Sequence, residues 1–561
     1  MTAYTYDADG KTKTTMVDGQ QLANVTYDAL QRMQQVAYPD GSALSAIGRD
    51  QAQRVLSQTW SIGGQAVSDA VVRSQSGRIV QQSTSSGTTS YSSMYGYDAA
   101  GRLTAATIPG HQLSYAFAAT GGCGPNTSAG KSGNRTGLTD VWTAPGQTAV
   151  TTQTSYCYDW ADRLRSTAVT GAIPGASNVA DGVPATEIVY DARGNTTRLG
   201  DMQFSYDAAN RHIGTTYADG STVVIVRDAT GRIVSRTIDP TGSAPAVVTK
   251  YLFASAGDAA WGQKVGTALT RSLGLPGGVS WTDQAGTVTW SFPNLGGHGL
   301  MTRSGGTNGA LLLWDPFGQP VDPTTFAVGT AASNDTGQVA GNSLWHQGAL
   351  KPAESVGSTL VVEMRARLYV PALGRFLQVD PIQGGVDNDY VWPPDPVGSH
   401  DLSGERRLPC SSDGGACGGV PSLMALRGNM PALSAPTQSY FGTRVSSSTR
   451  TARTSPGMQI MPFRRTAVLV APRLQHIMNR HLSGAPGAGQ FASGTSSAKI
   501  RDLITATVER GKISLNSGGR PNAVYDYRFD APIGTNSDHK ATPWLRVVVD
   551  EYGFVRTAFP F

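Results

Sequence analysis

The chain has 561 residues and a formal net charge of +5, and only 15% of its residues are charged. This length is sufficient for two or more domains. No run of about 18 apolar residues occurs, so we expect no membrane-spanning helix, and the N-terminus lacks the layout of a secretory signal peptide. The 67 glycines, together with frequent Thr, Ser, Val and Tyr, predict a mainly β protein.

The two parts of the chain differ in charge, and the chain has few cysteines. Residues 405–561 hold 19 Lys+Arg against 9 Asp+Glu, whereas residues 1–404 hold 26 against 31. A basic tail behind an acidic body indicates that the tail meets an anion, such as a nucleic acid. Four cysteines are too few for a disulfide framework. Cys410 and Cys417 are spaced to close a small loop, but we favour unpaired thiols.

A short repeat built on Tyr-Asp recurs through the first half of the chain. Each copy, such as YDAAGRL at Tyr97, predicts a strand, a tight turn, and an Arg that opens the next strand, because Asp, Gly and Asn accept turn conformations. We therefore assign the tyrosines and aspartates structural roles. The copies are Tyr6-Asp7, Tyr27-Asp28, Tyr97-Asp98, Tyr158-Asp159, Tyr190-Asp191 and Tyr206-Asp207, with a degenerate copy at Asp228.

These copies resemble the RHS/YD-repeat family. The resemblance implies that residues 1–313 form a long β-strip that spirals into a hollow shell. Periodicity alone predicts only hairpins in series.

Residues 314–404 resemble the RHS-associated core of the same family, and we call them the core segment. RLYVPALGRFLQVDP, from Arg367 to Pro381, matches the central pattern, and WDPFGQP at Trp314 fits its upstream element. The resemblance implies that this segment closes the shell.

The resemblance also implies that the core segment cleaves its own chain near Gly404, with Asp380 and Asp401 as an acid–base pair. Two neighbouring carboxyls share one proton, so one serves as acid and the other as base. Glu405 and Leu402 depart from the residues usual in the family. Two turn-forming aspartates are therefore the alternative.

The tail divides into a linker and a small domain. Residues 405–465 are rich in Ser, Pro, Gly, Thr and Arg, which predicts a flexible linker. Residues 466–561 predict an α+β domain with a helix over 471–480, a second helix, and three strands, of which the last is a hairpin. The second helix should start with a Ser cap, end at Gly511 and bury a stripe of Ile500, Leu503, Ile504 and Val508. Pairing Asp550 with Gly553 in that hairpin places Arg546 opposite Thr557 on one face.

This domain resembles bacterial EndoU-like nucleases, one branch of the small toxin RNases related to barnase and colicin E5. HIMNRH, from His476 to His481, and the closing VVVDEYGFVRTAFP carry the resemblance. The central lysine of that family has no clear counterpart. The candidates, which we also consider for substrate binding, are Lys499, Lys512 and Lys540.

Metal-independent RNA cleavage needs a base, an acid and a group that stabilises charge on the phosphate. Histidine suits both proton-transfer roles near neutral pH. We assign His476 and His481 as base and acid, Arg546 as the cation, Thr557 as a donor and Tyr527 as a stacking or donor group. Histidines five positions apart on one helix diverge, so we predict that the helix ends before His481. No zinc motif occurs.

Together these features predict a polymorphic toxin of the RHS family. Its tail would cleave RNA to 2′,3′-cyclic phosphate products in competition between bacteria, without a cofactor. We expect a secreted effector made in the cytoplasm, exported by dedicated secretion machinery, active in the target-cell cytoplasm and neutralised by an acidic immunity protein. The alternatives are a non-enzymatic surface or carbohydrate-binding protein, and a toxin that acts on DNA.

Overall fold

The computed structural model describes residues 1–254, 259–339, 341–356, 358–382, 388–409, 442–444, 468–470, 477–478, 481, 489–515, 523–549 and 555–561. The chain divides into two compact units, Met1–Met430 and Pro431–Phe561. Strands make up 48% and helices 9% of the structure, which confirms the mainly β class. Within the described ranges, no helix reaches the length and apolar character needed to cross a bilayer.

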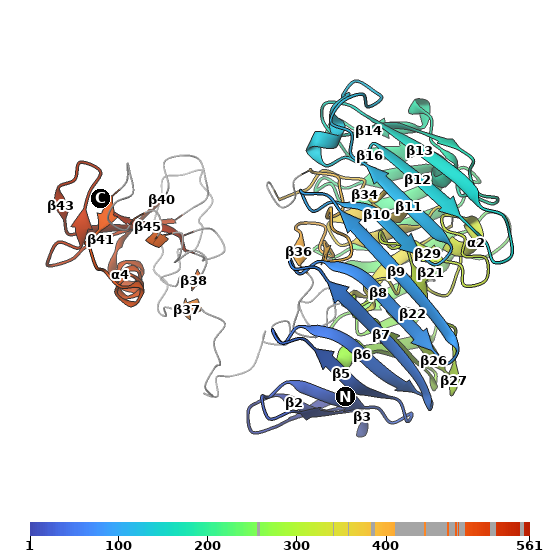
Figure 1. Ribbon diagram of the computed structural model, residues 1–561, viewed down its shortest axis with the longest axis horizontal. Helices are drawn as coiled ribbons and strands as arrows, with labels where there is room; N and C mark the ends of the chain where they lie inside the picture. Colours follow the sequence, from blue (N-terminus) through green and yellow to red (C-terminus); the bar gives the residue numbers. More distant parts are fainter. Residues whose placement is uncertain are drawn as a thin grey trace. The chain divides into compact units, whose positions relative to one another are not determined.

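The first unit begins with a 14-stranded antiparallel sheet in which each strand pairs with the next in sequence. Figure 1 shows these strands following one another as a strip, coloured from blue to cyan. Its strands are β1 Thr2–Tyr6, β2 Thr12–Val17, β3 Gln20–Tyr27, β4 Met33–Ala37, β5 Ala43–Arg49, β6 Val55–Ile62, β7 Gln65–Arg73, β8 Ile79–Ser86, β9 Thr89–Tyr97, β10 Leu103–Ile108, β11 His111–Ala116, β12 Gly137–Trp142, β13 Val150–Tyr158 and β14 Leu164–Thr170.

A 13-stranded sheet continues the same sequential order. Its strands are β15 Ile188–Tyr190, β16 Thr196–Leu199, β17 Met202–Tyr206, β18 His212–Tyr217, β19 Thr222–Arg227, β20 Ile233–Asp239, β21 Val247–Leu252, β22 Gly262–Val265, β23 Ala268–Gly274, β24 Ser280–Gln284, β25 Thr287–Pro293, β26 Gly299–Ser304 and β27 Thr307–Asn308. The short helix α1 (Asn178–Asp181) precedes it.

Six turns between repeat strands are held by an aspartate and the arginine four residues later; Asp7 and Asp191 instead hold Lys11 and Asn195 through the backbone N–H. In the turn at Asp98, one carboxylate oxygen accepts the backbone N–H of Arg102 (2.9 Å) and the other accepts its Nε–H (2.7 Å). The same side-chain bond recurs in Asp28–Arg32, Asp50–Arg54, Asp159–Arg163, Asp207–Arg211 and Asp228–Arg232, at 2.7–2.9 Å. The predicted turn role is confirmed, and Asp50 is a copy that sequence reasoning missed because no Tyr precedes it.

The repeat tyrosines fasten each strand to the one before it. The Tyr97 hydroxyl donates to the carbonyl of Ile79 at 2.9 Å, and the guanidinium of Arg78 lies over its ring, 5.4 Å from the centroid. Equivalent hydroxyl bonds to upstream carbonyls are made by Tyr27, Tyr158, Tyr190 and Tyr206. These side chains therefore serve the sheet.

The core segment folds as short elements that pack against strands of both large sheets. One hydrophobic cluster joins Tyr158 of β13 and Phe204 of β17 to Leu368. A second joins Leu103 to Tyr369 and Trp392. The elements are β28 Leu313–Trp314, β29 Pro320–Val321, α2 Ala331–Asn334, β30 Asn342–Ser343, β31 Lys351–Glu354, β32 Val361–Met364, β33 Arg367–Val370, β34 Arg375–Phe376, β35 Ser399–His400 and β36 Leu408–Pro409.

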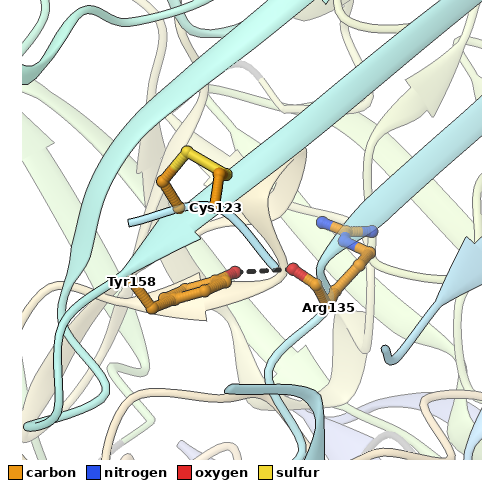
Figure 2. The surroundings of a disulfide bond; sticks show 4 residues. Cys123, Arg135 and Tyr158 are labelled. Atoms are coloured by element: carbon orange, nitrogen blue, oxygen red, sulfur yellow. Dashed lines mark hydrogen bonds between the residues drawn. A yellow bond between two sulfur atoms is a disulfide. The ribbon is translucent and has the colours of Figure 1, made fainter. Parts of the chain in front are cut away.

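A disulfide joins Cys123 to Cys157 across 34 positions of sequence. Figure 2 shows it beside Tyr158, whose hydroxyl donates to the carbonyl of Arg135 at 2.7 Å. The expectation of unpaired thiols is wrong for this pair, because the loop that carries Cys123 folds back onto β13 and its Asn126 N–H donates to the Tyr158 carbonyl. Cys410 and Cys417 lie outside the described residues.

In the second unit, helix α4 packs on a four-stranded antiparallel sheet of order β40-β41-β44-β45. Helix α4 is capped by Ser496 and ends before Gly511, as predicted, and its stripe of Ile500 and Val508 is buried. The elements are β37 Gly442–Arg444, β38 Val468–Val470, β39 Gln490–Phe491, α4 Ser497–Arg510, β40 Lys512–Leu515, β41 Ala523–Arg528, β42 Gly534–Thr535, β43 Ala541–Thr542, β44 Trp544–Val549 and β45 Val555–Pro560.

Part of the predicted linker is ordered into strands. Leu408 pairs with His400 in the first unit, and Thr443 pairs with Leu469 in the second. Most of residues 405–465 lie outside the described ranges.

We predict that the first unit loses stability in mild acid. Burial lowers the pKa of His298 to about 3 and that of His400 to about 4. Unfolded histidines have a pKa of about 6.5, so below that pH the unfolded chain takes up protons that these buried histidines do not. The free energy of unfolding therefore falls as the pH is lowered toward about 3.

Urea unfolding between neutral pH and pH 5 measures this slope. His298→Phe keeps a ring beside Trp345 and should flatten the slope, whereas His539→Phe, in an exposed turn of the second unit, should leave it unchanged. Equal slopes in all three proteins would contradict the prediction.

Candidate functional site

One arginine organises the two aspartates of the core segment. The Nη2 of Arg367, on β33, donates to Asp401 Oδ2 at 2.7 Å and lies 3.0 Å from Asp380 Oδ2. All three side chains are fully buried. The structure thus brings Asp380 and Asp401 to one cation, and their charges are balanced by a guanidinium in addition to any shared proton.

The same arginine contacts the peptide bond where cleavage is predicted. Its Nε–H donates to the carbonyl oxygen of Gly404 at 2.8 Å. On the other side of that bond, the N–H of Glu405 donates to Asp401 Oδ1 at 3.1 Å. The carbonyl is polarised by a cation, and a carboxylate lies at the nitrogen that would leave.

Asp380 differs from its partner in its surroundings. Its Oδ2 accepts no hydrogen bond from the residues that the structure describes, although Oδ1 accepts the N–H of Ile382 at 2.8 Å. Burial raises the pKa of Asp380, against the opposing effect of Arg367. A carboxyl with a raised pKa takes up a proton more readily than an ordinary aspartate, although Oδ2 also has its ion-pair contact with Arg367 at 3.0 Å.

Arg367 belongs to the sequence pattern of the core segment, but no role was predicted for it. The available signal was the burial of the surrounding residues, since an arginine inside an apolar strand such as RLYV must find an anionic or carbonyl partner. Its Nη1 also donates to the carbonyl of Asp389 at 2.6 Å.

In the second unit, His481 lies against the last strand. Its Nδ1 is 3.0 Å from the carbonyl oxygen of Gly489, to which it must donate, so Nε2 is the ring nitrogen left without this proton. Nε2 lies 3.4 Å from Thr557 Oγ1, and the ring stacks on Phe559 with centroids 5.5 Å apart. His481 is only 4% exposed. The structure therefore brings two of the predicted residues, His481 and Thr557, together.

The predicted register of the closing hairpin is wrong by two residues. Arg546 pairs with Phe559, and Thr557 pairs with Val548, because the register shifts between Val548 and Val549 and the connection is longer than a two-residue turn. A shift of two positions preserves the face. Arg546 and Thr557 thus still point to the same side of the sheet.

Arg546 is not an isolated cation. Its Nε and Nη2 donate to the two carboxylate oxygens of Asp526 at 2.8 and 2.7 Å, and hydrogen bonding to Asp526 raises the pKa of Arg546. Sequence reasoning missed Asp526, which lies directly opposite on β41. A bound phosphate would have to share this guanidinium with it.

The remaining predicted residues are scattered. Tyr527 pairs with the buried Leu545 on the face that α4 covers, so it points away from Arg546. The three candidate lysines are exposed, and Lys512 is the one whose position in β40 lies opposite Asp526. They are Lys499, in the first turn of α4, Lys512, and Lys540, beside β43.

His476 lies outside the described residues. His481 is itself helical, so the prediction that the helix ends before it is wrong. Its Gly489 contact shows how it is fixed: a chain segment eight residues further on folds back to its ring.

Comparisons with protein-family models and with curated proteins gave no match. Among solved structures, the crystal structure of TcdB2-TccC3-Cdc42 is similar, with 14% identity, 72% of this chain and 20% of that chain covered, and a TM-score of 0.50. The Tc holotoxin pore of Photorhabdus luminescens gives 14% identity, 75% and 20% coverage, and a TM-score of 0.48. This chain spans about a fifth of those chains. The first unit has an RHS-type β-shell fold.

We predict that Arg367→Met lowers the free energy of unfolding of the first unit by about 3–5 kcal/mol, because two buried carboxylates lose their cation. Urea denaturation measures the change. Arg32→Met, which breaks the partly exposed Asp28 pair, is the matched control and should cost about 1 kcal/mol or less. Equal costs in the two variants would show that Arg367 carries no buried charge compensation.

Proposed function

We propose that this chain is an RHS-type toxin that cuts itself after Gly404 and carries an RNA-cleaving C-terminal unit. The observation that carries the proposal is the contact of Arg367 with both aspartates and with the Gly404 carbonyl. Buried charged residues with a purely structural role need opposite charges nearby. They do not need to contact both the carbonyl and the N–H of one peptide bond, as these residues do.

In the proposed cleavage, Asp380 removes a proton from a water molecule that attacks the Gly404 carbonyl carbon. The Nε–H of Arg367 stabilises the negative charge that develops on the carbonyl oxygen. The carbon–nitrogen bond then breaks, and the proton passes through Asp401, which is hydrogen-bonded to the Glu405 nitrogen, to the leaving amine. Overall, one water molecule is consumed, and one carboxylate and one ammonium group are formed.

Mass spectrometry of the purified full-length chain tests self-cleavage. We expect two masses, for residues 1–404 and 405–561, and a single intact mass for Asp380→Asn, which removes the base. Asp395→Asn is the control, because Asp395 is a buried carboxyl of the same segment that pairs with Arg78. One intact mass for the unmodified chain would reject the activity.

For the C-terminal unit, the support is the His481–Thr557 contact on the sheet face that also carries Arg546. His481, whose Nε2 is directed to Thr557, serves as one proton-transfer group, and His476 is proposed as the other. Residues 466–561 hold 11 Lys+Arg against 7 Asp+Glu, which suits a polyanionic substrate. An acidic immunity protein that covers His481 would neutralise the unit in the producing cell.

Incubating residues 431–561 with total RNA in EDTA tests this activity. We expect RNA cleavage with 2′,3′-cyclic phosphate ends, and a loss of about 100- to 10,000-fold in His481→Ala. His539→Ala, in an exposed turn, should retain full activity. Nicked DNA with intact RNA would favour a DNA target, and no cleavage of either would favour a non-enzymatic surface protein.

A further inference from the structure

An aromatic stripe runs along the sheet face that carries His481. Phe559 and Phe561 are two positions apart, and so they lie on the same face. The ring of His481 stacks on Phe559 with centroids 5.5 Å apart. The ring centroids of Trp544 and Phe561 are 6.0 Å apart. The guanidinium of Arg546 lies over Phe561, 4.3 Å from the ring centroid. Phe561 N–H donates to the Trp544 carbonyl, so the ladder continues beyond β45.

The two ends of the stripe differ in access to solvent. His481 is 4% exposed, whereas Trp544 is 40% exposed. Helix α4 covers the opposite face of the sheet, where Leu545 and Val547 pack. Trp544 therefore lies outside the hydrophobic core formed by the described residues of this unit, and it is one of the exposed large apolar side chains.

Positive charge borders the exposed end. Arg528 is exposed and pairs with Trp544 across β41 and β44. Lys512 is exposed and lies opposite Asp526, in the row that continues through Arg546. Within the described part of the chain, Arg528 and Lys512 form no ion pair, so their charges are available to a polyanion.

We propose that Trp544 is a stacking platform for an unpaired nucleobase of single-stranded RNA, with Arg528 beside it at the phosphate backbone. Aromatic rings interleaved with cations bind single strands, because every base has a face that stacks. A duplex does not expose those faces, so the ligand is a single strand. The stripe then leads from the stacked base toward His481 and Thr557. This inference rests on the proposed RNase function, which supplies the substrate class.

Fluorescence anisotropy of a labelled short single-stranded RNA tests the proposal. The full-length chain carrying His481→Ala is used, so that binding is measured without turnover. Trp544→Ala should weaken binding about 5- to 100-fold, as expected for the loss of one stacked base. Trp544→Phe, which retains a ring, should restore most of the affinity. Trp261→Ala removes an equally exposed tryptophan (39%) of the first unit and should have no effect.

The outcomes separate this proposal from the nuclease proposal. Unchanged affinity in Trp544→Ala, or an equal loss in Trp544→Phe, overturns stacking even if RNA is cleaved. Trp544-dependent binding of the single strand, with no RNA cleavage by residues 431–561 in EDTA, leaves stacking in place and rejects the nuclease. An equal Trp544 dependence for double-stranded RNA also overturns the proposal.

Discussion

The contact of one buried guanidinium with two carboxyls is the interaction on which the first unit depends. Taking three charged groups out of water is costly, and the cost is recovered only when each finds a partner. Arg367 meets that demand for Asp380 and Asp401 while it also holds the carbonyls of Gly404 and Asp389. These contacts hold the end of the core segment, Asp401 and Gly404, against Arg367 of β33.

The repeats are stabilised by simpler, local contacts. Each Asp–Arg pair satisfies the backbone of a tight turn, and each tyrosine hydroxyl satisfies a carbonyl of the preceding strand. These are local contacts between residues close in sequence, so the strip can grow by repetition. The core segment supplies the apolar face that such a strip needs, as in the cluster of Tyr369, Phe376 and Trp392.

The features predicted correctly from sequence are those that local physics decides. The turn role of Asp98, the Ser496 cap and the Ile500–Val508 stripe of α4 all depend on residues within one or two turns of each other. The RHS-type shell came from a resemblance, and its fold is confirmed by the structure. Predicting these features required no information about contacts between residues distant in the sequence.

What sequence reasoning missed depends on long-range geometry. The Cys123–Cys157 pair requires a loop that folds back on β13, and the Asp526–Arg546 pair requires the register between two strands. The hairpin register shifted by two residues because an irregularity at Val548 cannot be read from the pattern. Arg367 was visible in its motif, but its role follows only from three partners that lie 13, 34 and 37 positions away.

The proposed role of the Arg367 contacts requires that water cuts the Gly404–Glu405 bond. Cell-free synthesis of the full-length chain in ¹⁸O-labelled water, so that the chain folds and is cut only after the label is present, followed by mass spectrometry of both products, tests this directly. We expect one labelled oxygen in the new carboxylate of Gly404 and none in the fragment that begins at Glu405. Both products should be missing in an Arg367→Met variant that remains folded. A chain that stays whole, or a cut at another bond, would contradict it.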